Sequence, residues 1–115
     1  METKKAIGQR GSWFAKVDGT PLPCIHKYWL KGLRYHDRYR RHENASTVKI
    51  EELVDAIRSG GKVILTDDDA SLNASGEVIG FDRTKYIAIY AVTAVEYDKD
   101  NGLRLNLSER LAHLE

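Results

Sequence analysis

The chain has 115 residues, the usual size of one domain, and its hydrophobic and charged fractions of 42% and 30% are typical of a folded globular protein. No apolar run approaches the roughly 20 residues that cross a bilayer. No apolar stretch follows the first lysines, so we expect neither a membrane span nor a secretory signal. The single Cys24 cannot form an internal disulfide, which indicates a reducing, cytoplasmic compartment.

The net charge of +1 hides a difference between the two parts of the chain. Residues 1–45 contain ten Lys and Arg against four Asp and Glu, a balance of +6, and residues 46–115 contain eight against thirteen, a balance of −5. This asymmetry predicts a surface with two charged faces of opposite sign, unless folding interleaves the two parts.

The N-terminal part of the chain mixes loop and strand signals. Residues 1–11 are polar and without a period, which predicts a loose arm, and residues 12–115 are expected to form a single domain. Residues 12–17 are aromatic and β-prone and stop at Asp18-Gly19, a strong turn signal.

The next residues are harder to assign. Pro21 and Pro23 each remove a backbone donor, which disfavours a regular central strand at these positions. The apolar spacing over residues 24–30 slightly favours a helix, although a short strand fits as well.

A helix is predicted over residues 47–59. Its apolar residues recur at i, i+3, i+4 and i+7 and therefore lie on one face, namely Ile50, Leu53, Val54 and Ile57. Gly60-Gly61 can supply the left-handed conformation that commonly ends a helix. We expect this face to pack against a strand over residues 86–97.

The C-terminal half is rich in β-forming residues. Strands are predicted over residues 62–66, 77–81, 86–97 and 103–107. The run Asp67-Asp68-Asp69 is expected to close the first of them in solvent, and residues 70–76 to form a loop. Residues 98–102 form a turn signal, so the last two strands are predicted to make a hairpin. Ser108 is a possible cap for a short helix through Leu114.

These elements predict an α+β fold: a small twisted antiparallel sheet or partly open β-barrel, with one well-defined helix at about 47–59 and a possible short C-terminal helix.

Residues 27–42 form the most unusual stretch, which we call the basic-aromatic segment. It carries six cations against the single acid Asp37, with aromatic residues interleaved. Cations neutralise phosphates and aromatic faces stack on unpaired bases, so this composition favours nucleic-acid binding. The expected binding residues are Lys27, Lys31, Arg34, Tyr35, Arg38, Tyr39, Arg40 and Arg41, with Tyr35 and Tyr39 as stacking platforms. The competing interpretation places Trp29 and some tyrosines in the core, while the cations are simply solvated or pair with the acidic second part of the chain.

Other chemistry is less well supported by the sequence. Cys24, His26, His36 and His42 match no zinc pattern built from two tight pairs, so we expect no metal and no cofactor. The aspartate run departs from a calcium loop, because Leu72 stands where glycine is required. Cys24 and His26 would share one side of a strand, but no third, orienting group is visible at a readable spacing.

The sequence therefore predicts a small nucleic-acid-binding domain, DNA or RNA, without catalytic activity of its own. The alternative is a protein-interaction or regulatory module whose opposed charged faces dock a partner or form a homo-oligomer through complementary charge. An enzyme with an unrecognised site is the third and weakest reading, and no membrane partner is expected.

Overall fold

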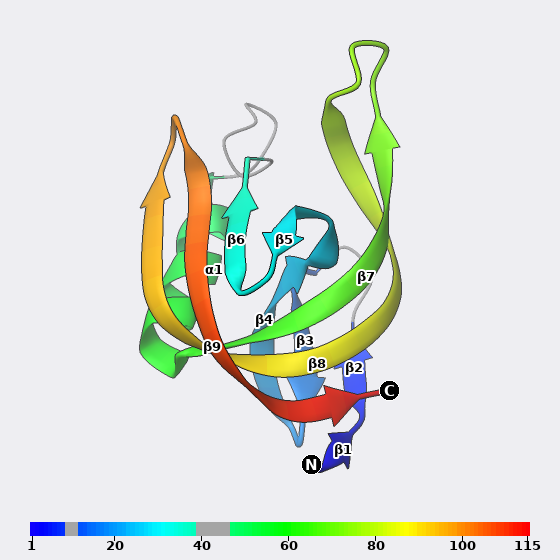
Figure 1. Cartoon of the computed structure of the whole chain (residues 1–115), viewed down its shortest axis with the longest axis vertical. Coiled ribbons are helices and arrows are strands. Elements are labelled where there is room, and N and C mark those ends of the chain that lie inside the picture. Colours follow the sequence, from blue (N-terminus) through cyan, green and yellow to red (C-terminus); the bar gives the residue numbers. More distant parts are fainter. Residues whose placement is uncertain (9–11, 39–46) are drawn as a thin grey trace.

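In the computed structural model, one sheet carries nearly all of the secondary structure (Figure 1). The structure describes residues 1–8, 12–38 and 47–115, and the side chains of these except at positions 47, 83 and 84. The described elements are, in chain order, β1 (Thr3–Lys4), β2 (Ala6–Gly8), β3 (Phe14–Val17), β4 (Thr20–His26), the 3₁₀-helix η1 (Lys27–Trp29), β5 (Leu30–Lys31), β6 (Arg34–Asp37), α1 (Thr47–Gly60), β7 (Lys62–Leu72), β8 (Val78–Asp98) and β9 (Gly102–Leu114).

The sheet has the strand order β2-β3-β4-β7-β8-β9-β6-β5, and β1 pairs with β9. A mostly β domain with one α-helix in its described part confirms the α+β class. The hydrogen-bonded path is open, with β2 and β5 at its ends, so the structure does not support a barrel. The pairs β4–β7 and β1–β9 are parallel, so the expectation of a purely antiparallel sheet is wrong at these two places.

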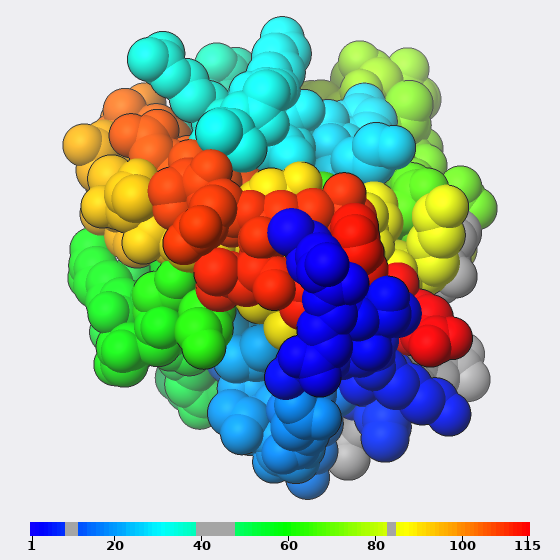
Figure 2. Space-filling view, turned by 60° about the horizontal axis from the view of Figure 1, so that its bottom comes forward, coloured from blue at the N-terminus to red at the C-terminus, as the bar shows by residue number. Residues whose placement is uncertain are grey.

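The first residues are part of the sheet. Thr3 and Lys4 pair with His113 and Leu114, whereas residues 6–8 pair with β3. Figure 2 shows this N-terminal segment lying across the C-terminal part of β9. The prediction of a loose arm is therefore wrong for residues 3–8, while residues 9–11 lie outside the described residues.

β4 passes through both prolines, although their missing N–H donors disfavour a regular central strand. The N–H of Cys24 donates to the carbonyl of Trp13, so this position faces β3. Because strand positions alternate, the nitrogens of Pro21 and Pro23 face the opposite edge. There β7 pairs only with Cys24, Ile25 and His26, so neither proline has to donate to a neighbouring strand.

The three long strands differ from their predicted bounds. β7 continues through the aspartate run to Leu72, and β8 joins two predicted strands into one of 21 residues. The predicted hairpin around residues 98–102 is confirmed. The predicted C-terminal helix is wrong, because residues 108–114 continue β9, where His113 pairs with Ala88 on one side and Thr3 on the other.

The helix lies against β8 and β4 and closes the larger of two apolar cores (Figure 1). Its four predicted core residues are all buried, which confirms the predicted face. The smaller core contains Cys24, Ile64 and Ile89 together with residues of β2, β3 and the end of β9. No helix among the described residues is long and apolar enough to cross a membrane.

Candidate functional site

The basic-aromatic segment begins with η1 and continues through β5 and β6. Of its predicted binding residues, Lys27, Lys31, Arg34 and Arg38 are exposed. Tyr39, Arg40 and Arg41, like His42, lie outside the described residues, so their role stays a prediction.

The four described cations make no ion pair with any described residue. Basic residues elsewhere in the described chain form ion pairs. Lys4 contacts Asp18 at 2.6 Å, and Arg104 contacts Glu96 at 3.1 Å. The idea that cations of the segment are neutralised by the acidic second part of the chain is therefore wrong for these four. No acid among the described residues neutralises these four charges.

Two of these cations lie side by side. Lys31 and Arg34 are directly opposite each other in the β5–β6 pair, and paired residues project from the same face of a sheet. Arg34 also lines a shallow depression of about 230 Å³ on β6, β8 and β9, together with His36, Arg104 and Asn106. Glu96 lines the same depression and pairs with Arg104, so the cations without a described acidic partner lie on β5 and β6, at Lys31 and Arg34.

An aromatic cluster forms where η1 meets β8. Its members are His26, Tyr28, Trp29 and Phe81. Tyr28 meets Trp29 and Phe81 edge-on, with ring centroids 5.9 Å apart in both pairs, and 55% of Tyr28 is exposed. Phe81 is remote in sequence, and nothing in its local pattern indicated that it would join the segment.

The prediction that Tyr35 is a stacking platform for bases is wrong. Its side chain is 1% exposed and belongs to the larger core, so the ring cannot stack on a base in this structure. The β5–β6 pairing explains this, because Leu30 and Tyr35 project from the face opposite to Lys31 and Arg34. Tyr28 is the exposed aromatic residue of the described segment that can take the stacking role.

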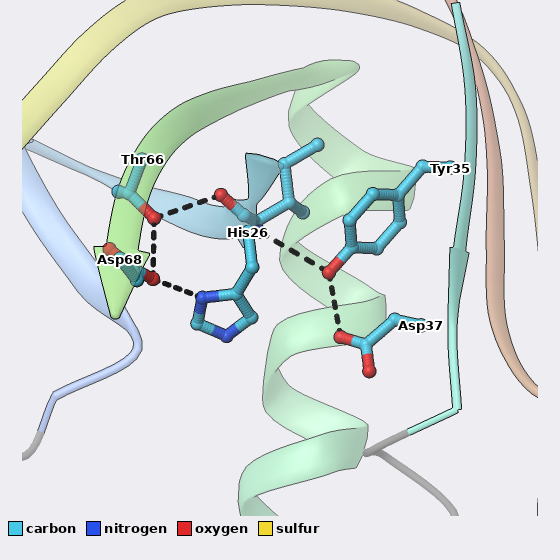
Figure 3. A network of polar contacts seen from close by, with 6 residues as sticks. His26, Tyr35, Asp37, Thr66 and Asp68 are labelled. Carbon is cyan, nitrogen blue, oxygen red and sulfur yellow. Dashed lines mark hydrogen bonds and ion pairs between the residues drawn. The ribbon is translucent and has the colours of Figure 1, made fainter. Parts of the chain in front are cut away.

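His26, a member of the aromatic cluster, also forms a polar pair with Asp68 (Figure 3). Nδ1 of His26 bonds Oδ2 of Asp68, and the side chains are 10% and 2% exposed. The hydroxyl of Thr66 lies 2.8 Å from the same oxygen and 3.1 Å from the carbonyl of Ile25, and its single hydrogen serves one acceptor at a time. The His26 ring stacks on Phe81 with 4.0 Å between ring centroids. Nε2 of His26 forms no hydrogen bond with a described residue.

A second polar chain fixes the backbone of His26. Its N–H donates to the hydroxyl of Tyr35 at 3.3 Å, and that hydroxyl donates to Asp37 at 2.7 Å (Figure 3). Asp37 is fully buried. The imidazole is thus held at the side chain by β7 and at the backbone by β6.

The orienting group that the sequence did not reveal is Asp68. The aspartate run was expected to be a solvated strand end, yet Asp68 is buried within β7, which corrects that expectation. His26 and Asp68 are 42 residues apart and meet because β4 and β7 pair in parallel. Cys24, by contrast, lies in the smaller core, where its sulfur contacts the carbonyl of Leu22 at 4.0 Å.

No three His, Cys, Asp or Glu side chains are grouped for metal binding in the part of the chain that the structure describes. No protein-family model matches the sequence, and neither a curated protein nor a solved structure shows significant similarity to it.

Proposed function

We propose that this protein binds single-stranded nucleic acid through Tyr28 and the exposed cations around it. The observation that carries the proposal is the Tyr28 ring, which is 55% exposed and lies in the sequence between Lys27 and Lys31, two exposed lysines that form no ion pair with a described residue. An exposed ring accepts an unpaired base, and each stacked base contributes about 1–3 kcal/mol. The neighbouring ammonium groups neutralise phosphates and release counterions.

The cations on β5 and β6 suggest the path that the bound nucleic acid takes over the surface. Lys31 and Arg34 project from one face, and Arg34 borders the depression that Arg104 also lines. If a base of the nucleic acid stacks on Tyr28, the phosphates next to it would lie near the positive charges of β5 and β6. Arg38, Arg40 and Arg41 extend this charge in the sequence, and the proposal includes them together with Tyr39.

A titration of fluorescent oligonucleotides at low salt tests this proposal. Single strands should bind more tightly than a duplex, and log K should fall with log salt with a slope of about −0.7 per neutralised phosphate. Replacing Tyr28 with Ala should weaken binding by about 1–3 kcal/mol, whereas Tyr28→Phe, which keeps the ring, should bind nearly as wild type does. No binding at tens of micromolar, or equal binding by Tyr28→Ala, would contradict the proposal.

A matched pair of charge reversals separates local contacts from net charge. Lys27→Glu with Lys31→Glu should remove most of the affinity. Lys62→Glu with Lys99→Glu reverses two other exposed lysines and makes the same change in net charge, so binding should fall much less. We expect Arg40→Glu with Arg41→Glu to act like the first pair.

Self-association is a second candidate function. The hairpin of β7 and β8 exposes Leu72 and Ile79, at 52% and 46%, beside the exposed acids Asp69 and Asp82. Such a surface could dock on the basic face of a second copy. A sizing column at two salt concentrations tests this, because association by charge predicts an oligomer at low salt that dissociates at high salt.

A further inference from the structure

We infer that His26 and Asp68 form a general-base site that cleaves single-stranded RNA at its 2′-hydroxyl. This inference rests on the proposed binding of a strand at Tyr28 and goes beyond it, since binding alone needs no buried histidine–carboxylate pair. Both side chains are largely removed from solvent, and burying such a pair is costly, so it is weak evidence for a purely stabilising role.

The hydrogen bonds determine which nitrogen of His26 can accept a proton. With Asp68 ionised, the carboxylate only accepts, so Nδ1 carries the hydrogen and donates it to Oδ2. In the neutral ring Nε2 then has a free lone pair, and it has no hydrogen-bond partner among the described residues. A carboxylate on one ring nitrogen and an open lone pair on the other are the arrangement of a histidine general base.

The ring is also held in position. Phe81 stacks on one face at an interplanar angle of 14°, and Trp29 meets it edge-on with ring centroids 5.8 Å apart. Tyr35 fixes the backbone nitrogen of the same residue. A base held in a single orientation loses little entropy when it meets its substrate.

The surroundings identify the substrate class. Trp29 and Phe81 each contact both His26 and Tyr28, so one ring separates the imidazole from the exposed tyrosine on which we place the nucleotide. Lys27 follows His26 directly in the sequence, is exposed, and can neutralise the adjacent phosphate. A ribose 2′-hydroxyl is the nucleophile that such a strand carries beside its own phosphodiester.

The reaction balances without a metal or redox partner. Nε2 of His26 takes the proton of the 2′-hydroxyl, the 2′-oxygen attacks phosphorus, and the bond from phosphorus to the 5′-oxygen breaks. The leaving 5′-oxygen takes a proton from water, and His26 returns its proton to the hydroxide so formed. The products are a 2′,3′-cyclic phosphate and a 5′-hydroxyl. His26 is the catalytic residue, and Asp68 is a positioning residue that acts through it.

The first test uses the wild-type protein alone. It is incubated, with a chelator present, with one single-stranded sequence made as RNA, as 2′-O-methyl RNA and as DNA. We expect all three to be bound and only the RNA to be cleaved, with cyclic phosphate ends. RNA that is bound and stays intact overturns this inference and leaves the proposed function standing. If none of the three is bound or cleaved, both are overturned.

Variants then test the assignment to these two residues. His26→Ala should reduce the cleavage rate at least about a hundredfold, the usual contribution of a general base, and added imidazole should restore part of it. Asp68→Asn should lower the rate while binding of 2′-O-methyl RNA stays unchanged. His113→Gln, which removes a histidine of β9 that lies between β1 and β8 and outside the proposed binding surface, is the control and should cleave normally. If His26→Ala and Asp68→Asn cleave at the wild-type rate, the site lies elsewhere and the inference fails.

Discussion

His26, the last residue of β4, bonds Asp68 on β7 across a parallel pair of strands. The pair joins two elements that are far apart in the sequence, and Thr66 and Tyr35 bond to its members. Its stability and its chemistry can therefore be tested separately.

Removing the carboxylate should destabilise the fold. Asp68→Ala leaves the buried imidazole without its partner, and breaking a buried pair in this way usually costs about 3–5 kcal/mol. Urea unfolding measures the loss. Asp68→Asn keeps an acceptor oxygen of similar shape and should cost clearly less. If both variants lose the same free energy of unfolding, the acceptor oxygen that Asp68→Asn retains contributes little to stability.

The helix core is tested at Leu53, which is fully buried between α1 and the sheet. Leu53→Ala should lower the free energy of unfolding by about 2–5 kcal/mol, the usual cost of a large-to-small change in a core. Val48 is the control, because it lies on the same helix and is 63% exposed. Val48→Ala should change stability by no more than about 0.5 kcal/mol. A loss at Leu53 as small as that at Val48 would contradict the packing of α1.

Gly102 at the start of β9 tests how closely the β8–β9 hairpin approaches β6. Its φ is +81°, and a Cβ there would lie 2.2 Å from the carbonyl oxygen of Asp37. Gly76 has nearly the same φ of +82°, but a Cβ there would meet nothing within 4 Å. Alanine should cost about 1–2 kcal/mol at both positions for the backbone conformation. Gly102→Ala should cost a further 1–3 kcal/mol, roughly, for the overlap with Asp37. Thermal unfolding of the two variants provides the comparison.

The turn of the same hairpin should depend on pH. The pKa of Asp98 lies below its ordinary value of 3.8, mainly because the side chain of Asn101 donates to it and then because the backbone N–H of Asn101 does so. A carboxylate whose pKa is lower in the folded state stabilises the fold above the unfolded pKa and loses that contribution as the pH falls through the folded pKa.

Thermal unfolding of wild type and Asp98→Ala should therefore differ at neutral pH, and the difference should shrink as the pH falls below about 4. Asp55→Ala, which removes an exposed carboxylate from α1, controls for the change in net charge. A difference between wild type and Asp98→Ala that is constant from neutral pH to about pH 2 would contradict this role of the turn.

The sequence predicts those parts of the fold that local patterns determine. The apolar spacing from Ile50 to Ile57 is sufficient for α1, and the turn signal before Leu103 is sufficient for the β8–β9 hairpin. The C-terminal residues were misassigned because their conformation depends on β1, which pairs with His113 from more than a hundred residues away. A window of sequence contains no information on that partner.

In the candidate site, too, some features follow from the local sequence and others depend on residues that are distant in the sequence. The exposed cations Lys27 and Lys31 could be proposed from composition alone. The burial of Tyr35 depends on which face of β6 meets the core, and the contact of Phe81 with His26 depends on how far β7 and β8 extend. Asp68 was visible only as one of three aspartates, and its distinct burial arises from the register of β7.

Photo-crosslinking can show whether a nucleic-acid strand lies on Tyr28. Single-stranded RNA containing 4-thiouridine is crosslinked to the wild-type protein at low salt, and the adducts are mapped after trypsin digestion. Because trypsin cleaves after Lys27 and Lys31, Tyr28 and Trp29 fall in one short peptide, residues 28–31. We expect this peptide to carry the main adduct, and the adduct to be lost in Tyr28→Ala. Adducts confined to peptides of α1 or of the β8–β9 hairpin, or an unchanged yield in Tyr28→Ala, would contradict the claim.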